Sequence, residues 1–208
     1  MKKLVLTAMI FAMSLTLFAQ YEKDKDETKE KGFKKENFFT GGSVTASFYS
    51  GGTVLGVSPS FGYSINKIVD AGITLNFTYT GERAYSGDKY RQYVYGPGVF
   101  ARIFPVNMIF VQGTYEHNFI SQTLKPAYGG ADQKFKADAN SFLIGGGYAS
   151  GREGVGTTFF YLSVLVDIIK DPNSPYVELL QNGSYRSVPI IRAGLQIPLF
   201  QGKGRTRD

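Results

Sequence analysis

The feature of this 208-residue chain that most limits its fold is a regular alternation of apolar and small polar residues, which begins at Phe38. In residues 69–80, VDAGITLNFTYT, every odd position is apolar or aromatic and every even position is glycine or short and polar. Residues 55–65 follow the same rule, with glycine and serine at the even positions. A period of two predicts β-strands whose two faces meet different environments.

Segments with this alternation follow one another along the chain. They cover residues 38–50, 55–65, 69–80, 90–104, 108–119, 140–149, 157–169 and 187–200. Strands of soluble proteins usually have about 5–6 residues, whereas a tilted strand that crosses a bilayer needs ~9–11. The even number and the length of the segments predict an all-β fold, an eight-stranded antiparallel up-and-down transmembrane β-barrel. Only in 140–149 do glycines 145–147 leave the facing of the strand undecided.

The connections between the expected strands differ at the two ends of the barrel. One end has short turns at residues 66–68 and 105–107 and a further turn around 150–154. The other end has a tight hairpin at Gly51–Gly52 and long loops at 81–89, 120–139 and 170–186. Short periplasmic turns and longer outer loops are typical of outer-membrane barrels.

A soluble barrel that binds a ligand also alternates, but it turns its apolar face inward. Period two alone does not decide between the two. The second face is small and polar, which suits a narrow interior better than a hydrophobic core. The final strand ends on the aromatic Phe200, and aromatic residues gather at strand ends, as interfacial girdles do. These are Tyr79, Tyr93, Tyr95, Phe159 and Phe160.

The segments on either side of the barrel have their own composition. Residues 1–19 combine a positive start, an apolar core and a small Ala19, which predicts a cleaved signal peptide. Residues 20–37 alternate acids and bases, so we expect a disordered periplasmic linker, either a spacer or a tether to a partner. The barrel is expected at 38–200, followed by a basic periplasmic tail at 201–208.

Composition excludes several classes of function. The chain has no cysteine and one histidine, which argues against disulfides, a cysteine-linked lipid anchor and a metal site, and we expect no cofactor. The net charge of +6 comes from residues in the leader, linker, loops and tail. Without a basic stripe of stacking aromatics, we expect no nucleic-acid partner.

From Phe38 to Phe200 the chain resembles the small eight-stranded OmpA/OmpX-like outer-membrane barrels, in particular the Bacteroidota-type outer membrane protein β-barrel domain. The resemblance rests on the alternation, the Gly-Gly hairpin and the closing strand. It implies a place in the bacterial outer membrane, contact with outer-membrane lipid, and passage through the barrel-assembly machinery during biogenesis. It implies no activity, because a fold does not determine a function.

Charges at even or odd positions that face inward are candidate site residues. Successive residues of a strand face opposite sides, and we call this odd-even rule parity. By parity, five charged side chains point into the interior: Asp70, Arg102, Glu116, Asp167 and Arg192. Counting from the strand ends places Asp70 near Arg102 and lets Glu116 meet Arg192 across the lumen, where Asp167 could join them. A lone charge in so narrow an interior is costly, so we expect a paired network that plugs the lumen. A gated or proton-sensing lumen is the alternative.

Two further features bear on function. His117 lies by parity on the outward face, with Ser121 four residues on, which is weak support for a lipid-modifying enzyme. Loop 170–186 carries an apolar patch that could pack on the barrel rim or dock a partner. Its members are Tyr176, Val177, Leu179 and Leu180.

The sequence therefore predicts a non-enzymatic barrel that acts as a structural or accessory subunit of the envelope or of an outer-membrane complex. A narrow, porin-like channel for small solutes is the first alternative, and it requires an open lumen. A lipid-modifying barrel enzyme centred on His117 is the second.

Overall fold

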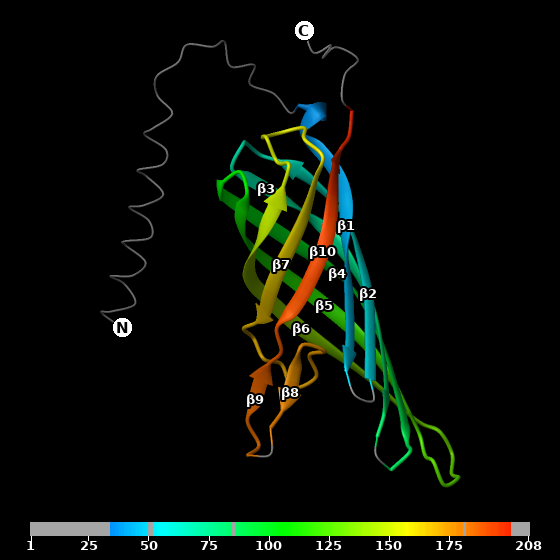
Figure 1. The fold of residues 1–208 in the computed structure, drawn as a ribbon. Coiled ribbons are helices and arrows are strands. Elements are labelled where there is room, and N and C mark those ends of the chain that lie inside the picture. The colour runs from blue at the N-terminus through cyan, green and yellow to red at the C-terminus, as the bar shows by residue number, and fades with distance from the viewer. Residues whose placement is uncertain (1–33, 50–51, 85, 181, 201–208) are drawn as a thin grey trace, which may run out of the picture. The chain divides into compact units, whose positions relative to one another are not determined.

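Eight antiparallel strands close into one barrel in the computed structural model, which describes residues 34–49, 52–84, 86–180 and 182–200 (Figure 1). The all-β, eight-stranded fold expected from the alternation is thereby confirmed. The expected signal peptide, most of the linker and the basic tail lie outside the described residues. No helix within the described ranges is both long and apolar enough to cross a membrane.

The strands run round the barrel in sequence order, and the last pairs with the first. They are β1 (Phe38–Tyr49), β2 (Gly52–Ser64), β3 (Val69–Arg83), β4 (Lys89–Val106), β5 (Ile109–Lys125), β6 (Gln133–Ser150), β7 (Phe159–Asp167) and β10 (Ile190–Pro198). A small pair, β8 (Val177–Leu179) and β9 (Tyr185–Ser187), lies in the connection between β7 and β10. A 3-10 turn, η1 (Lys35–Asn37), precedes β1, and Asn37 donates to the carbonyl of Ser64 at 2.8 Å.

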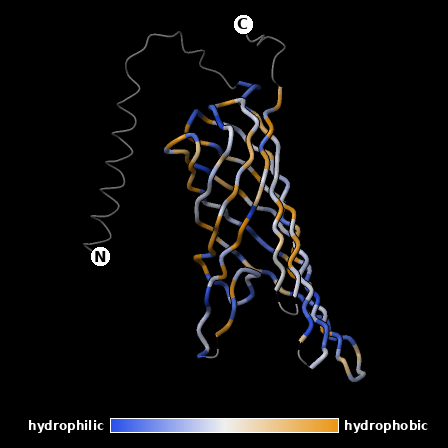
Figure 2. The backbone as a smooth tube through the Cα atoms, in the orientation of Figure 1, coloured by the Kyte–Doolittle hydropathy of each residue, from blue (hydrophilic) through white to orange (hydrophobic). Residues whose placement is uncertain are grey.

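The two faces of the barrel are the reverse of those of a soluble barrel. Large apolar side chains point outward and remain about half exposed, such as Ile73 at 59% and Leu162 at 52%. Small polar side chains such as Ser58, Thr74 and Asn76 point inward and are buried. Figure 2 shows the resulting alternation of hydrophobic and hydrophilic positions along the strands. So large an exposed apolar surface is unsuited to water, and it matches a barrel whose outer face contacts lipid.

The strands differ in length from one side of the barrel to the other. β4 and β6 have 18 residues each, whereas β7 and β10 have 9 each. The β3–β4 and β5–β6 hairpins therefore extend past the closed part of the barrel, at the lower right in Figure 1. We call this projecting part, residues 78–94 and 119–138, the wall. We call its end of the barrel the loop end, and the end with connections 65–68 and 107–108 the turn end.

The long loop expected at 120–139 is wrong, because strands β5 and β6 occupy most of this segment. β5 continues to Lys125 and β6 begins at Gln133, so only residues 126–132 connect them. The strands do continue through this segment, but hydroxyl and charged residues replace apolar residues on its outward face. A search for apolar periodicity therefore ends the strands too early.

The tips of the two long hairpins are fastened to each other. The backbone N–H of Ala127 and the hydroxyl of Ser86 both donate to the carboxylate of Asp88, each at 2.7 Å. These two donors, the Ala127 N–H above all, lower the pKa of Asp88 below its ordinary value. The bond from one hairpin to the other holds the wall together at its free end.

Strict alternation also settles the facing of β6, which the sequence left undecided, and corrects that of Phe159 in β7. In β6, Gly145 and Gly147 point inward while Ile144 and Tyr148 point outward. In β7, Phe160 is outward and 65% exposed, but Phe159 is inward and 2% exposed. The expectation that Phe159 belongs to an outer aromatic girdle was therefore wrong, because adjacent strand residues must face opposite sides.

Inward glycines make room for the aromatic rings that fill the turn end of the lumen. Gly194 of β10 is paired with Tyr161 of β7, and a Cβ at Gly194 would overlap the Tyr161 ring. Gly147 has the same relation to the ring of Phe110. The rings can therefore pack only because these positions carry no side chain.

We expect Gly194→Ala to lower the free energy of unfolding by about 1–3 kcal/mol, because the Tyr161 ring must leave its place. Gly113→Ala is the matched control, since that Cβ points outward and meets Phe142 only at 3.5 Å. Urea unfolding of both variants in lipid vesicles measures the difference. Equal midpoints for the two variants would contradict the role of Gly194.

Candidate functional site

The lumen holds two layers of bonded polar side chains, and the first lies at the turn end around Asp70. Its carboxylate accepts from Arg152 at 3.1 Å and from the amide of Gln196 at 3.3 Å. Both side chains of the Arg152–Asp70 ion pair are almost completely buried. Arg152 comes from the turn after β6, donates to the carbonyl of Lys67 at 2.8 Å, and lies 3.6 Å from the centre of the Phe104 ring. Asp70 thus has a cation partner that parity counting did not find.

Arg102 is the neighbour of Asp70 in the β3–β4 register, as expected, but the two are not an ion pair. Arg102 donates instead to the side-chain oxygens of Gln112 at 2.7 Å and Gln196 at 3.1 Å. Gln196 therefore links the two charges, since it accepts from Arg102 and donates to Asp70.

Aromatic rings complete the surroundings of the Arg102 guanidinium. Its central carbon lies 4.2 Å from the centre of the Tyr161 ring, 4.9 Å from that of Phe100 and 5.4 Å from that of Phe110. Ring faces attract a cation, most of all where water is excluded. Amide oxygens and ring faces thus hold this buried charge where a carboxylate was expected.

The second layer, at the loop end, is centred on Glu116 and Arg192. They form an ion pair of 2.9 Å whose side chains are 0% and 6% exposed. The hydroxyl of Tyr176 donates to Glu116 at 2.7 Å and receives hydrogen bonds from Asn76 at 2.8 Å and from Arg192 at 3.3 Å. Glu116 and Arg192 meet across the lumen where the strand heights place them, and a tyrosine from the loop closes over them.

Asp167 is buried near this layer but serves a different purpose. One oxygen accepts from the hydroxyl of Ser174 at 2.7 Å, and the other accepts from the backbone N–H groups of Phe142 and Ile169 at 3.1 Å each. Ser174 is also 3.0 Å from the hydroxyl of Ser141. Asp167 thus fixes the start of the β7–β10 connection to β6, and the structure does not bring it to Arg192.

Tyr176 is not part of an exposed docking patch. Its side chain is only 7% exposed and points into the barrel, because the connection after Asp167 folds back over the lumen. The other members of the expected patch stay nearer the surface, with Leu179 64% exposed and Val177 and Leu180 half-buried. Arg186 and Glu178 pair across β8 and β9 and support this hairpin.

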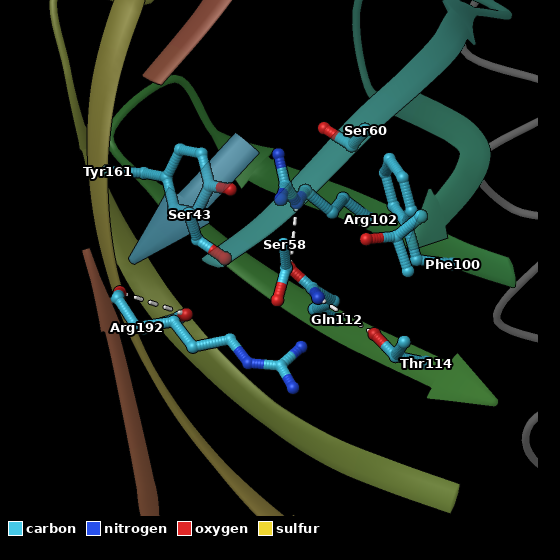
Figure 3. A pocket seen from close by; sticks show the side chains of 11 residues that line it. Ser43, Ser58, Ser60, Phe100, Arg102, Gln112, Thr114, Tyr161 and Arg192 are labelled. Atoms are coloured by element: carbon cyan, nitrogen blue, oxygen red, sulfur yellow. Dashed lines mark hydrogen bonds between the residues drawn. The ribbon is translucent and has the colours of Figure 1, made fainter. Parts of the chain in front are cut away.

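Between the two layers the lumen contains a cavity of about 10 Å³ (Figure 3). Arg102, Arg192 and hydroxyl side chains such as Ser43 and Ser163 line it. The Nε of Arg192 is buried and lacks a hydrogen-bond partner among the described residues. A cavity of this size has room for about one water molecule. The space between the two layers is therefore almost completely occupied by side chains.

His117 lies on the outward face of β5, as parity places it. Its Nδ1 is 2.8 Å from the side-chain oxygen of Asn140, which also accepts from the hydroxyl of Tyr115 at 2.9 Å. The ring meets Phe119 edge to face at 4.8 Å. Ser121 pairs in register with Lys136, one outward position beyond Phe119. An amide partner provides neither a nucleophile nor a base, so this group lacks the parts of a catalytic triad.

Metal binding finds no support in the described part of the chain, where no three acidic or histidine side chains gather closely enough to hold an ion. The polar groups of the lumen are instead arranged as mutual partners.

Comparison with known proteins yields similarity of fold only. No family model matches the chain, and no curated protein matches it. Ail, the attachment invasion locus protein of Yersinia pestis, shares 8% identity at a TM-score of 0.45, over 77% of this chain and 95% of Ail. Neisserial surface protein A shares 13% sequence identity at a TM-score of 0.44, and the match covers 78% of this chain and 97% of that protein. The N-terminal barrel of Pseudomonas aeruginosa OprF shares 12% sequence identity at a TM-score of 0.39, and the match covers 77% of this chain and 96% of that domain.

At these identities and scores, the three structures bear neither on the function of this chain nor on any single residue. The fold follows from the chain's own strand order, which closes through β1 and β10. Its polar interior and apolar exterior match the eight-stranded outer-membrane type that the sequence resembles.

We expect Arg192→Leu to lower the free energy of unfolding by about 3–5 kcal/mol, because Glu116 would remain buried without its cation. The double variant Arg192→Leu/Glu116→Gln removes both charges and should recover most of that loss. Urea unfolding in lipid vesicles compares the parent and the two variants. If Arg192→Leu unfolds at the same urea concentration as the parent, the ion pair does not stabilise the barrel.

Proposed function

We propose that the protein is a non-enzymatic integral barrel of the bacterial outer membrane that serves as a structural or accessory component of the envelope. The observation that carries this proposal is the contrast between the two parts of the molecule. The lumen is filled by two bonded layers, whereas the wall presents side chains outside the closed barrel, among them Gln92 and Gln122.

Membrane placement is supported by the outer surface. Aromatic pairs lie at both ends of the apolar face, as in Tyr79 with Tyr93 at 5.1 Å between ring centres and Phe38 with Phe61 at 5.4 Å. Aromatic girdles of this kind mark the two interfaces of an outer-membrane barrel. Short periplasmic turns and longer outer loops are typical of such barrels, which supports a turn end in the periplasm and a wall outside the cell.

The channel and enzyme alternatives find less support. A solute would have to pass the layer of Glu116, Arg192 and Tyr176 and a cavity of about 10 Å³, which has room for a single water molecule. An enzyme centred on His117 would need a nucleophile and a base, and Asn140 is neither.

An accessory role is supported by a cleft of about 560 Å³ between the inner face of the wall and the loop around Pro172–Pro175. Gln92 and Gln122 line it and lie opposite each other in the β4–β5 register. Their side-chain amides have no hydrogen-bond partner within the described ranges, and both are half-buried. Such amides can pair with the uncharged polar groups of a bound partner segment.

The filled lumen predicts that the protein conducts no steady ionic current. Purified parent protein should leave a planar lipid bilayer silent, and a tagged porin inserted under the same conditions is the positive control. A stable open conductance from the parent would support the channel alternative and contradict a sealed barrel.

The accessory role predicts that the protein leaves its own membrane, in mild detergent, as one complex of fixed stoichiometry. We expect Gln92→Ala/Gln122→Ala to dissociate it, because the cleft loses its amides. Ser121→Ala/Thr123→Ala, on the outward face of the same wall, should leave it intact. Native gels and mass spectrometry measure the composition. A lone barrel bound only to lipid in the parent sample would rule out the subunit role.

A further inference from the structure

The outward face of the wall is strongly basic. The β3–β6 register aligns its outward residues in successive rows across the strands. The row nearest the closed barrel contains Tyr79, Tyr93, Ser121 and Lys136. The next row contains Gly81, Arg91, Thr123 and Lys134, and the row nearest the hairpin tips contains Arg83, Lys89 and Lys125. We call the six cations in these rows the basic band.

All six cations face the same way as the apolar side chains that surround the closed barrel. Odd residues of β3, β4 and β5 point outward, as Ile73, Val99 and Val111 show, and even residues of β6 do so, as Ile144 shows. The basic band continues these series toward the loop end. Its side chains are exposed, apart from Lys125, which is half-buried.

Most of the basic band carries no neutralising partner. Lys125 pairs with Asp132 at 3.2 Å, but the other five cations have no carboxylate within 4.0 Å in the ranges that the structure describes. Asp138 is the one acid on this face of β6, next to Lys136 in the outward series. Asp88 at the hairpin tip is occupied by Ala127 and Ser86. The face therefore has a surplus of positive charge.

The basic band lies just beyond the edge of the apolar surface, at the level expected for lipid headgroups. The next outward row toward the closed barrel contains Phe77, Tyr95 and Phe119 together with Asp138, and its three rings belong to the aromatic border of the apolar surface. Successive rows are ~7 Å apart along a strand, or ~5 Å along the membrane normal at a tilt of about 45°. Three rows thus span ~10 Å, comparable with the headgroup layer of one leaflet.

We propose that the basic band binds the phosphate groups of an anionic glycolipid in the outer leaflet. Lysine and arginine side chains attract phosphates at the membrane surface, and arginine can bind them with two hydrogen bonds. The cations point sideways over the apolar surface, which is the direction of neighbouring lipids. This inference rests on the membrane orientation in the proposed function, because it needs the wall to stand above the outer leaflet.

The test measures binding of a bisphosphorylated lipid A-type glycolipid to the purified full chain in detergent micelles, by native mass spectrometry. We expect Arg91→Gln/Lys134→Gln/Lys136→Gln to weaken binding roughly a hundredfold, at about fivefold for each cation removed near an anionic surface. Lys34→Gln/Lys35→Gln/Lys67→Gln removes the same charge at the turn end and should bind like the parent. The dephosphorylated glycolipid should bind the parent about as weakly as the first variant binds the phosphorylated one.

Other outcomes overturn the inference in ways that can be told apart. Equal binding by the two triple variants would show that the basic band is not the lipid site. Equal binding of both glycolipids, with displacement by a soluble sulfated polysaccharide, would assign the band to a soluble polyanion. Insertion into neutral phosphatidylcholine vesicles is measured in parallel. If the parent protein inserts but its glycolipid binding does not depend on the basic band, only the glycolipid inference is refuted and the proposed function is retained. If the parent protein never inserts, both the inference and the proposed function are refuted.

Discussion

The ion pair of Glu116 and Arg192 is the interaction on which the rest of the lumen depends. Two charges buried without water are costly unless they are paired, and further hydrogen bonds to them offset more of that cost. The Tyr176 hydroxyl donates to Glu116 and accepts from Arg192 and Asn76, and it brings the β7–β10 connection over the barrel mouth. The same requirement recurs at the turn end, where Asp70 is held by Arg152 and Gln196. A narrow barrel must fill its interior, and here paired polar groups and aromatic rings do so.

Parity was enough to predict the fold and the inward position of all five lumen charges, because in a strand each residue faces opposite to the last. It could also have found Gln112 and Gln196, which lie inward in the same series. It could not find Arg152 or Tyr176, which enter the lumen from a turn and a loop that have no period. The pairing of Asp70 therefore differs from the expected one, although its position does not.

The wall escaped prediction for a different reason. Its strands keep the period of two, but the outward residues change from apolar to mostly cationic and hydroxyl-bearing. Apolar periodicity reports where lipid or core is contacted, so it ends at the edge of the membrane. The regular strands of this protein extend further than its hydrophobic surface, and that difference in length exposes both the cleft and the basic band.

The position of β10 has a consequence for assembly. Arg192 and Gln196, which complete the two lumen layers, both belong to this last strand, and β1 joins it through the residues Phe39–Val44. Until β10 is in place, Glu116 lacks its cation and Asp70 lacks one of its donors. A chain that stalls before the last strand thus holds the carboxylate of Glu116 without its cation and has an open edge at β1. Closure of the seam between β1 and β10 therefore also brings Arg192 to Glu116, so that the barrel closes and this charge is paired in the same step.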